Sequence, residues 1–106
     1  MKTLGAYMIV KDEESCIATC LNSIINICDE IVIVDTGCSD KTMEIVASFN
    51  SPKIKTSTFK WVNDFSAARN YAMRLTTADY VFTTDADEEL PFEITLDEDK
   101  GIEYKK

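Results

Sequence analysis

The chain has 106 residues, enough for one domain that buries about two thirds of its unfolded surface. Its net charge is −8, from 11 basic and 19 acidic residues, so the lysine and arginine clusters that bind a nucleic acid polymer are not expected. No apolar stretch approaches the length of a membrane span, and the first residues do not resemble a signal peptide, so we expect a cytoplasmic protein.

Strand-like and helix-like segments alternate along the first 84 residues. Continuous apolar runs rich in β-branched residues predict buried strands, and apolar residues repeated every three or four positions predict helices. The expected strands are residues 4–10, 31–34, 54–59 and 80–84, and the expected helices are residues 13–27, a helix that begins at Ser39 or Asp40 and ends at 50–52, and a helix that begins at Asp64 or Ser66. This order predicts an α/β fold, an open and mainly parallel sheet with helices on both faces, Rossmann-like.

A different pattern follows residue 90. Residues 91–96 alternate as in a half-exposed strand, and Pro91 suits its first position. Residues 97–106 are too polar to bury much surface, so we expect them to fray. The predicted organisation is a βαβαβαβ unit over residues 1–90, followed by a polar tail over residues 91–106 that adds at most one edge strand.

The four cysteines are predicted to be small apolar core residues in a reducing compartment. They are Cys16, Cys20, Cys28 and Cys38. Their spacing matches no zinc pattern, and the chain has no histidine to complete one. The lack of histidine also excludes Ser-His and Cys-His nucleophile chemistry within the chain.

Acidic residues follow two of the expected strands. Asp35 follows residues 31–34, and Asp85 and Asp87 follow residues 80–84. Alternate residues of an extended chain share a side, so Asp85 and Asp87 aim at one point and repel each other unless a cation lies between them. Mg²⁺ or Mn²⁺ bound by one or two carboxylates keeps positions open for phosphate oxygens. Because ligands of open parallel sheets bind at the carboxyl ends of strands, we predict a metal-assisted diphosphate site there. The alternative is a solvated acidic loop that closes a strand.

Two further features belong to this predicted site. In the turn at residues 34–40, Gly37 permits a positive φ, and the Asp35 carboxylate can accept from a base N–H or a ribose hydroxyl. The alternative is a loop whose Asp and Ser only cap the next helix. Arg69 lies in the first turns of the third helix, where backbone donors and a guanidinium can meet an anion. Its alternative is an exposed arginine that pairs with a nearby acid.

Four motifs occur in the order found in family 2 glycosyltransferases: residues 8–14 (MIVKDEE), 34–42 (VDTGCSDKT), 64–70 (DFSAARN) and 85–88 (DADE). Over residues 4–90 the chain resembles the nucleotide-binding half of their GT-A fold. The resemblance implies a nucleotide-sugar donor, first of all a UDP-sugar, and Mg²⁺ or Mn²⁺ as cofactor. The resemblance also implies which residues bind the nucleotide sugar: Val10, Lys11 and Asp35 beside the base, Asp85 beside the ribose, and Arg69 near the nucleotide. The metal ligands that it implies are Asp87 and Asp85.

The chain departs from the family pattern in sequence and in length. Cys38 stands where Ser or Thr is usual, and Asp12 stands where Asn is usual. Family members are about twice as long as this chain. Nothing after Leu90 resembles their second half, which carries the acceptor site and the catalytic base. The catalytic residue is therefore unknown, and Glu88, Glu89 and Glu93 are better explained as solvated acids. We predict a glycosyltransferase-like domain that binds a nucleotide-diphosphate sugar through a metal, for transfer to an acceptor hydroxyl, and that is incomplete here.

Three other functions compete with this prediction. A non-catalytic truncated module could act through self-association, because an uncovered strand at residues 80–84 would be a sheet edge able to pair with a second copy. A response-regulator-like domain needs an Asp at the end of the third strand, and residues 57–59 contain none. A phosphatase with an Asp-x-Asp nucleophile is disfavoured because that motif normally follows the first strand.

Overall fold

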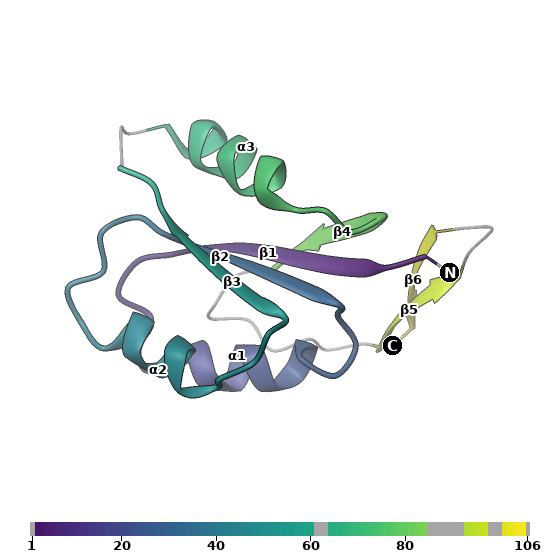
Figure 1. The fold of residues 1–106 in the computed structure, drawn as a ribbon, viewed down its shortest axis with the longest axis horizontal. Coiled ribbons are helices and arrows are strands. Elements are labelled where there is room, and N and C mark those ends of the chain that lie inside the picture. The colour runs from purple at the N-terminus through teal and green to yellow at the C-terminus, as the bar shows by residue number, and fades with distance from the viewer. Residues whose placement is uncertain (1, 61–63, 85–92, 98–100, 106) are drawn as a thin grey trace.

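The computed structural model describes residues 2–60, 64–84, 93–97 and 101–105. Its main sheet has four parallel strands in the order β3-β2-β1-β4 (Figure 1). The elements are β1 (Leu4–Val10), α1 (Ile17–Ile24), β2 (Glu30–Asp35), α2 (Thr42–Ser48), β3 (Ile54–Thr58), α3 (Phe65–Leu75) and β4 (Tyr80–Thr83). The predicted α/β class and the parallel sheet are confirmed. Helix α1 is shorter than the expected 13–27, because turns flank it on both sides.

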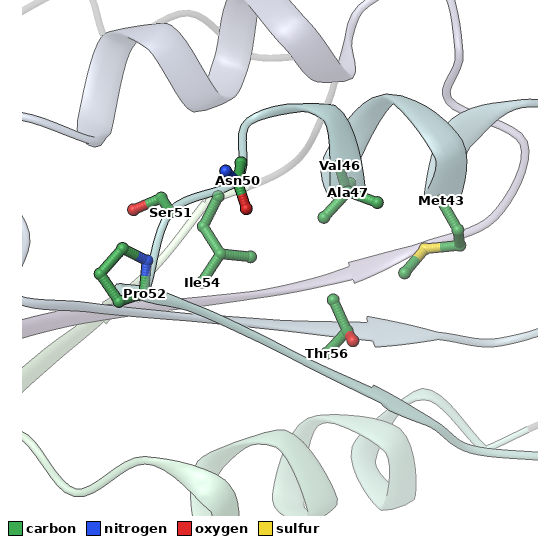
Figure 2. Close-up of a pocket in the computed structure, with 8 residues that line it drawn as sticks. All are labelled: Met43, Val46, Ala47, Asn50, Ser51, Pro52, Ile54 and Thr56. Atoms are coloured by element: carbon green, nitrogen blue, oxygen red, sulfur yellow. The ribbon is translucent and has the colours of Figure 1, made fainter.

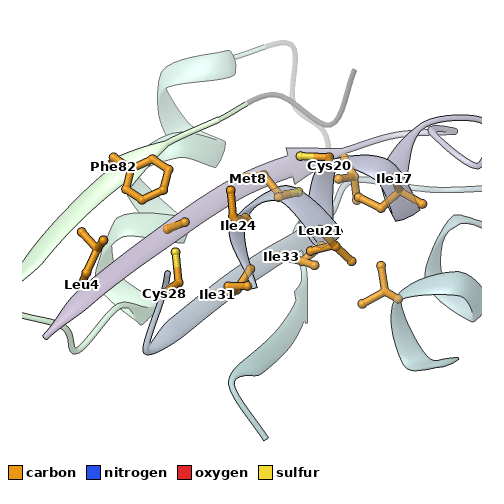
Figure 3. Packing of buried hydrophobic residues seen from close by; sticks show 13 residues of the cluster. Leu4, Met8, Ile17, Cys20, Leu21, Ile24, Cys28, Ile31, Ile33 and Phe82 are labelled. Carbon is orange, nitrogen blue, oxygen red and sulfur yellow. The ribbon is translucent and has the colours of Figure 1, made fainter. Parts of the chain in front are cut away.

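Helices cover both faces of the sheet, which explains the continuous apolar sequences of β1 and β2. Figure 1 shows α1 and α2 on one side and α3 on the other. Because successive residues of a strand point to opposite faces, alternate residues of β1 and β2 enter two separate cores. The core under α1 and α2 includes Leu4, Ala6, Met8, Val10, Ile31 and Ile33 (Figure 3), and the core under α3 includes Tyr7, Val32, Val34 and Ala72.

The cysteines agree with the prediction of apolar packing. Cys20 and Cys28 are buried in the core under α1, and Cys16 and Cys38 are half-buried. None of the four forms a disulfide within the described part of the chain. Burial raises the pKa of Cys28 to about 12, so this thiol stays protonated and unreactive at neutral pH.

The strand order fixes where a ligand site should form. The chain winds from β1 through β2 to β3 on one side of β1, and then crosses back to β4 on the other side. The winding therefore reverses between β1 and β4, and ligands of such sheets bind at the carboxyl edge beside this point. The register pairs Val10 with Asp35 and Asp35 with Thr58, so the last residues of β1, β2 and β3 share that edge.

At the opposite, amino edge a buried carboxylate joins three segments that are distant in sequence. Glu30, only 5% exposed, accepts hydrogen bonds from the Thr77 backbone N–H (2.7 Å), the Thr77 hydroxyl (2.7 Å) and the Ala78 N–H (3.2 Å). It also forms a 2.6 Å ion pair with Lys55. Gly5 lies against this cluster, where a Cβ would stand 2.8 Å from the Ala78 Cβ, so only glycine allows the approach.

The tail differs from the expectation of one strand followed by fraying chain. Strands β5 (Glu93–Asp97) and β6 (Gly101–Lys105) form their own antiparallel pair. The register sets Ile94 opposite Tyr104 and Leu96 opposite Ile102, so apolar positions match along the pair. The sequence prediction did not include β6, because the polar composition of residues 97–106 gave no sign of this register. None of the helices in the described part of the chain is long and apolar enough to cross a membrane.

Candidate functional site

The ends of β1 and β2 are tied together at the carboxyl edge. Val10 is fully buried, and its carbonyl oxygen accepts hydrogen bonds from the Thr36 backbone N–H (3.1 Å) and the Thr36 hydroxyl (2.9 Å). Thr36 is itself buried. Val10 and Asp35, two residues of the predicted site, are therefore direct neighbours on a rigid edge, and Lys11 follows Val10 as an exposed residue.

Asp35 closes the turn that follows β2. Its Oδ1 accepts hydrogen bonds from the backbone N–H groups of Gly37 and Cys38, both at 2.8 Å. Gly37 has a φ of 116°, a conformation that favours glycine, as predicted for this turn. Partial burial alone would raise the pKa of Asp35, but the Cys38 and Gly37 donors outweigh it and lower that pKa below its ordinary value. Asp35 is therefore a firmly ionised acceptor.

Asp12 holds the same loop from the other side. It has a φ of 54°, in the left-handed region. Its Oδ1 accepts from the backbone N–H groups of Ser39 (2.7 Å) and Asp40 (3.2 Å), and from the Ser39 hydroxyl (3.2 Å). No local sequence pattern predicts this role of Asp12, because its partners lie 27 and 28 residues away.

The loop after β2 holds the loop after β1 in return. Asp40 accepts a hydrogen bond from the Glu14 backbone N–H (3.2 Å), and the Thr42 hydroxyl accepts one from the Glu13 N–H (2.8 Å). The Thr42 N–H donates to Asp40 at 2.9 Å. Desolvation alone would raise the pKa of Asp40, but the Thr42 hydroxyl and the backbone N–H groups of Thr42 and Glu14 outweigh it and lower that pKa below its ordinary value. The two loops are thus linked in both directions.

Asp12, Cys38 and Asp40 offer ligand atoms within 4.8 Å of one another, a spacing that could hold a metal ion. Both carboxylates already accept backbone hydrogen bonds, so loop closure accounts for their positions without a cation. Burial raises the pKa of the Cys38 thiol, which disfavours the thiolate that a metal would bind. We therefore assign no metal to this group.

Helix α3 begins as predicted and packs beside the site. The Asp64 carboxylate caps it by accepting from the Ala67 N–H (3.2 Å). The Phe59 and Tyr71 rings lie 5.1 Å apart, and the Phe59 N–H donates to the Asp35 carbonyl (2.9 Å), which connects α3 to the end of β2. Arg69 is exposed on this helix, and its place near the nucleotide stays a prediction. Asp85 and Asp87 lie outside the described residues, so their metal and ribose roles also stay predictions.

A groove of about 550 Å³ lies between α2, β3 and the turn that joins them (Figure 2). Its lining is uncharged: Met43, Val46, Ala47, Asn50, Ser51, Pro52, Ile54 and Thr56. It shares no residue with the predicted site, and it contains no titratable group that could meet a metal or a diphosphate. We therefore do not place the predicted metal and diphosphate site in this groove.

Comparison with known proteins settles the family. The model of the family described as glycosyl transferase family 2 matches residues 6–97. The chain belongs to this family. SunS, a glycosyltransferase of Bacillus subtilis, is 34% identical over 85 residues, which are 80% of this chain and 20% of SunS. An uncharacterised glycosyltransferase of Rickettsia typhi is 33% identical over 94 residues, which are 89% of this chain and 31% of that protein.

A third relative is a TPR repeat-containing protein of Synechococcus elongatus, 39% identical over 93 residues, which are 88% of this chain and 22% of that protein. The family 2 chain therefore spans about a fifth to a third of the length of these relatives.

Solved structures share the GT-A fold. A mannosyltransferase of Pyrobaculum calidifontis, in complex with GDP-Man and Mn²⁺, has a TM-score of 0.73 and 23% identity, covering 85% of this chain and 29% of its own. TarS of S. aureus has a TM-score of 0.71 and 24% identity, covering 89% and 28%. Glucosyl-3-phosphoglycerate synthase of Mycobacterium tuberculosis, in complex with Mn²⁺, UDP and phosphoglyceric acid, has a TM-score of 0.69 and 18% identity, covering 80% and 33%. The predicted fold family is confirmed.

Proposed function

We propose that this family 2 domain binds the nucleoside diphosphate part of a sugar donor, first of all a UDP-sugar, at the carboxyl edge of its sheet. The observation that carries the proposal is the ionised Asp35, fixed at the end of β2 beside the end of β1 and facing the edge where such folds bind ligands. Its Oδ1 is engaged by the turn, so Oδ2 is the oxygen that would accept from a base N–H or a ribose hydroxyl.

A divalent cation fits the donor atoms that the sequence brings to this edge. Asp85 and Asp87 offer carboxylate oxygens, the ligands that Mg²⁺ and Mn²⁺ prefer. Similar folds have been crystallised with Mn²⁺ together with GDP-Man or UDP. When bound, the ion would offset the charge of the leaving diphosphate. Asp35 would orient the nucleoside, and the exposed Lys11 and Arg69 would add positive charge near the nucleotide.

The chain supplies the donor side of glycosyl transfer. In the complete reaction an acceptor hydroxyl attacks the anomeric carbon, the bond from that carbon to the diphosphate breaks, and a base takes the hydroxyl proton. We assign no base among the 106 residues.

We expect the 106-residue chain to bind UDP in the presence of Mn²⁺, with a Kd in roughly the micromolar to millimolar range, and to transfer no sugar. Isothermal titration calorimetry with UDP and GDP, in MnCl₂ and in EDTA, measures the binding, and incubation with UDP-sugars measures transfer. Absence of binding for both nucleotides in MnCl₂, or equal affinity in EDTA, would contradict the proposed site. Steady sugar transfer would contradict the assignment of an incomplete active site.

Self-association through the sheet edge is a second proposal. β4 pairs with β1 on one side, and within the described residues β5 pairs with β6 and not with β4. Backbone N–H and C=O groups at an uncovered edge favour pairing with another chain. We expect sedimentation velocity at increasing concentration to reveal a dimer. A strict monomer at the highest concentration reached would argue against a role in self-association.

A further inference from the structure

We infer that Asp12 is a positioning residue for the donor site: its carboxylate holds the loop after β2 against the loop after β1, and so fixes Asp35 and Lys11 relative to each other. The ligand in this inference rests on the proposed function, whereas the linkage between the loops is a property of the fold alone.

Two aspartates together hold four consecutive backbone N–H groups. Asp35 accepts from those of Gly37 and Cys38, and Asp12 accepts from those of residues 39 and 40. The strand end thus fixes the first half of this segment, and Asp12 fixes the second half. Without Asp12, the second half of this segment would be held to the loop after β1 only by the bonds that Asp40 and Thr42 accept from the Glu14 and Glu13 N–H groups.

The backbone of Asp12 suits it to this task. It follows Lys11 directly, and its φ of 54° turns the chain at the point where it leaves β1. A left-handed conformation is unfavourable for most L-residues, but aspartate and asparagine adopt it readily. The same residue therefore sets the backbone beside Lys11 and reaches Ser39 and Asp40.

The linkage also bears on where the phosphates of the donor bind. Consecutive backbone N–H groups in a turn form a concave site that attracts anions. In residues 37–40 carboxylates already occupy these groups. A diphosphate would have to displace Asp35 or Asp12 to bind them, so this loop positions the nucleoside and does not bind the phosphates.

Three substitutions of Asp12 separate geometry from charge. Asp12→Asn keeps an oxygen acceptor and tolerance of the left-handed backbone, Asp12→Gly keeps only the backbone tolerance, and Asp12→Ala keeps neither. We expect UDP affinity in MnCl₂ to stay within about two-fold for Asn and to fall about ten-fold or more for Gly and Ala. Amide hydrogen exchange at Ser39 and Asp40 should quicken in Gly and Ala, while exchange at Ile31 and Ile33 in the core stays slow.

Several results would overturn the inference. Asp12→Gly with unchanged UDP affinity and unchanged exchange at Ser39 and Asp40 would show that the carboxylate positions nothing. If Asp12→Asn bound UDP as weakly as Asp12→Ala, the charge of Asp12 would matter and the geometry that it holds would not. If the unmodified chain bound neither UDP nor GDP, the proposed function would fail, yet the exchange comparison would still decide whether Asp12 holds the loop.

Discussion

Replacing Glu30 by glutamine is expected to lower the free energy of unfolding by about 2–3 kcal/mol, because a buried amide cannot satisfy both Lys55 and the Thr77 donors. Burial alone would raise the pKa of Glu30, but the Lys55 ammonium and the donors of Thr77 and Ala78 outweigh it and lower that pKa to about 2. Relative to its ordinary value of 4.5, this lowered pKa corresponds to at most about 3–4 kcal/mol of stability. The midpoint of thermal unfolding should fall by roughly 10–20 °C.

The same carboxylate gives the protein an acid-sensitive stability. Because the folded-state pKa of Glu30 is lowered, its contribution is present above pH 4.5 and is lost as the pH falls from 4.5 toward about 2. In Glu30→Gln the unfolding free energy should therefore change less steeply across this interval than in the unmodified chain. Urea denaturation at several pH values between 7 and 2.5 measures the difference.

Glu44→Gln is the matched control for this experiment. Glu44 is exposed in the first turn of α2, so its loss should change the unfolding free energy by no more than about 0.5 kcal/mol. If Glu30→Gln were as stable as Glu44→Gln, with the same pH dependence as the unmodified chain, the Glu30 cluster would not be what joins β2, β3 and the segment before β4.

Replacing Asp35 by asparagine is expected to weaken UDP binding in MnCl₂ by about 10- to 100-fold while the turn stays folded. The amide oxygen can still accept from Gly37 and Cys38. The second carboxylate oxygen is replaced by an NH₂ group. This group is a donor and faces a donor of the ligand, so the hydrogen bond that the carboxylate oxygen accepted is lost. Because the pKa of Asp35 is lowered, binding by the unmodified chain should not weaken through this residue as the pH falls from 7 to 5. Calorimetry measures both effects.

Asp79→Asn provides the same chemical change at the opposite edge. Asp79 accepts from the Thr3 backbone N–H (2.8 Å) and the Thr3 hydroxyl (3.1 Å), and it lies just before β4. A β1 of seven residues separates the two edges by roughly 20 Å, so Asp79→Asn should leave UDP affinity unchanged. Equal affinities for the Asp35 and Asp79 variants would remove Asp35 from the nucleotide site.

Local sequence patterns were enough to predict the sheet and its covering helices. The apolar runs in β1 and β2, buried on both faces, and the alternation of strands with helices were sufficient for the fold. Asp35 was correctly placed at the carboxyl edge because strand ends in a parallel sheet must meet there, and the register pairs it with Val10 at the end of β1. Asp64 and Ser66 were the two predicted caps of the third helix, and Asp64 is the one that caps it.

The missed features depend on contacts between distant residues. Glu30 begins a strand, and its partners at 55, 77 and 78 are not suggested by any nearby pattern. Asp12 was known only as a departure from the family's usual asparagine, yet it makes the same kind of bond that an asparagine oxygen could make. Strand β6 was missed because its polar composition concealed an apolar register with β5.

We propose that Asp35, Asp85 and Asp87 lie at one rim of the sheet, where Asp85 and Asp87 hold the ion that binds the diphosphate and Asp35 orients the nucleoside. The most direct measurement is the broadening of backbone amide NMR signals by Mn²⁺ in the presence of UDP, because a paramagnetic ion broadens the signals nearest to it. We predict the strongest broadening at 85–87, with Lys11 and Asp35 also affected and with Thr3, Glu30 and Thr77 at the amino edge left sharp. Broadening centred on the amino edge, or spread evenly over exposed acidic residues, would contradict the account.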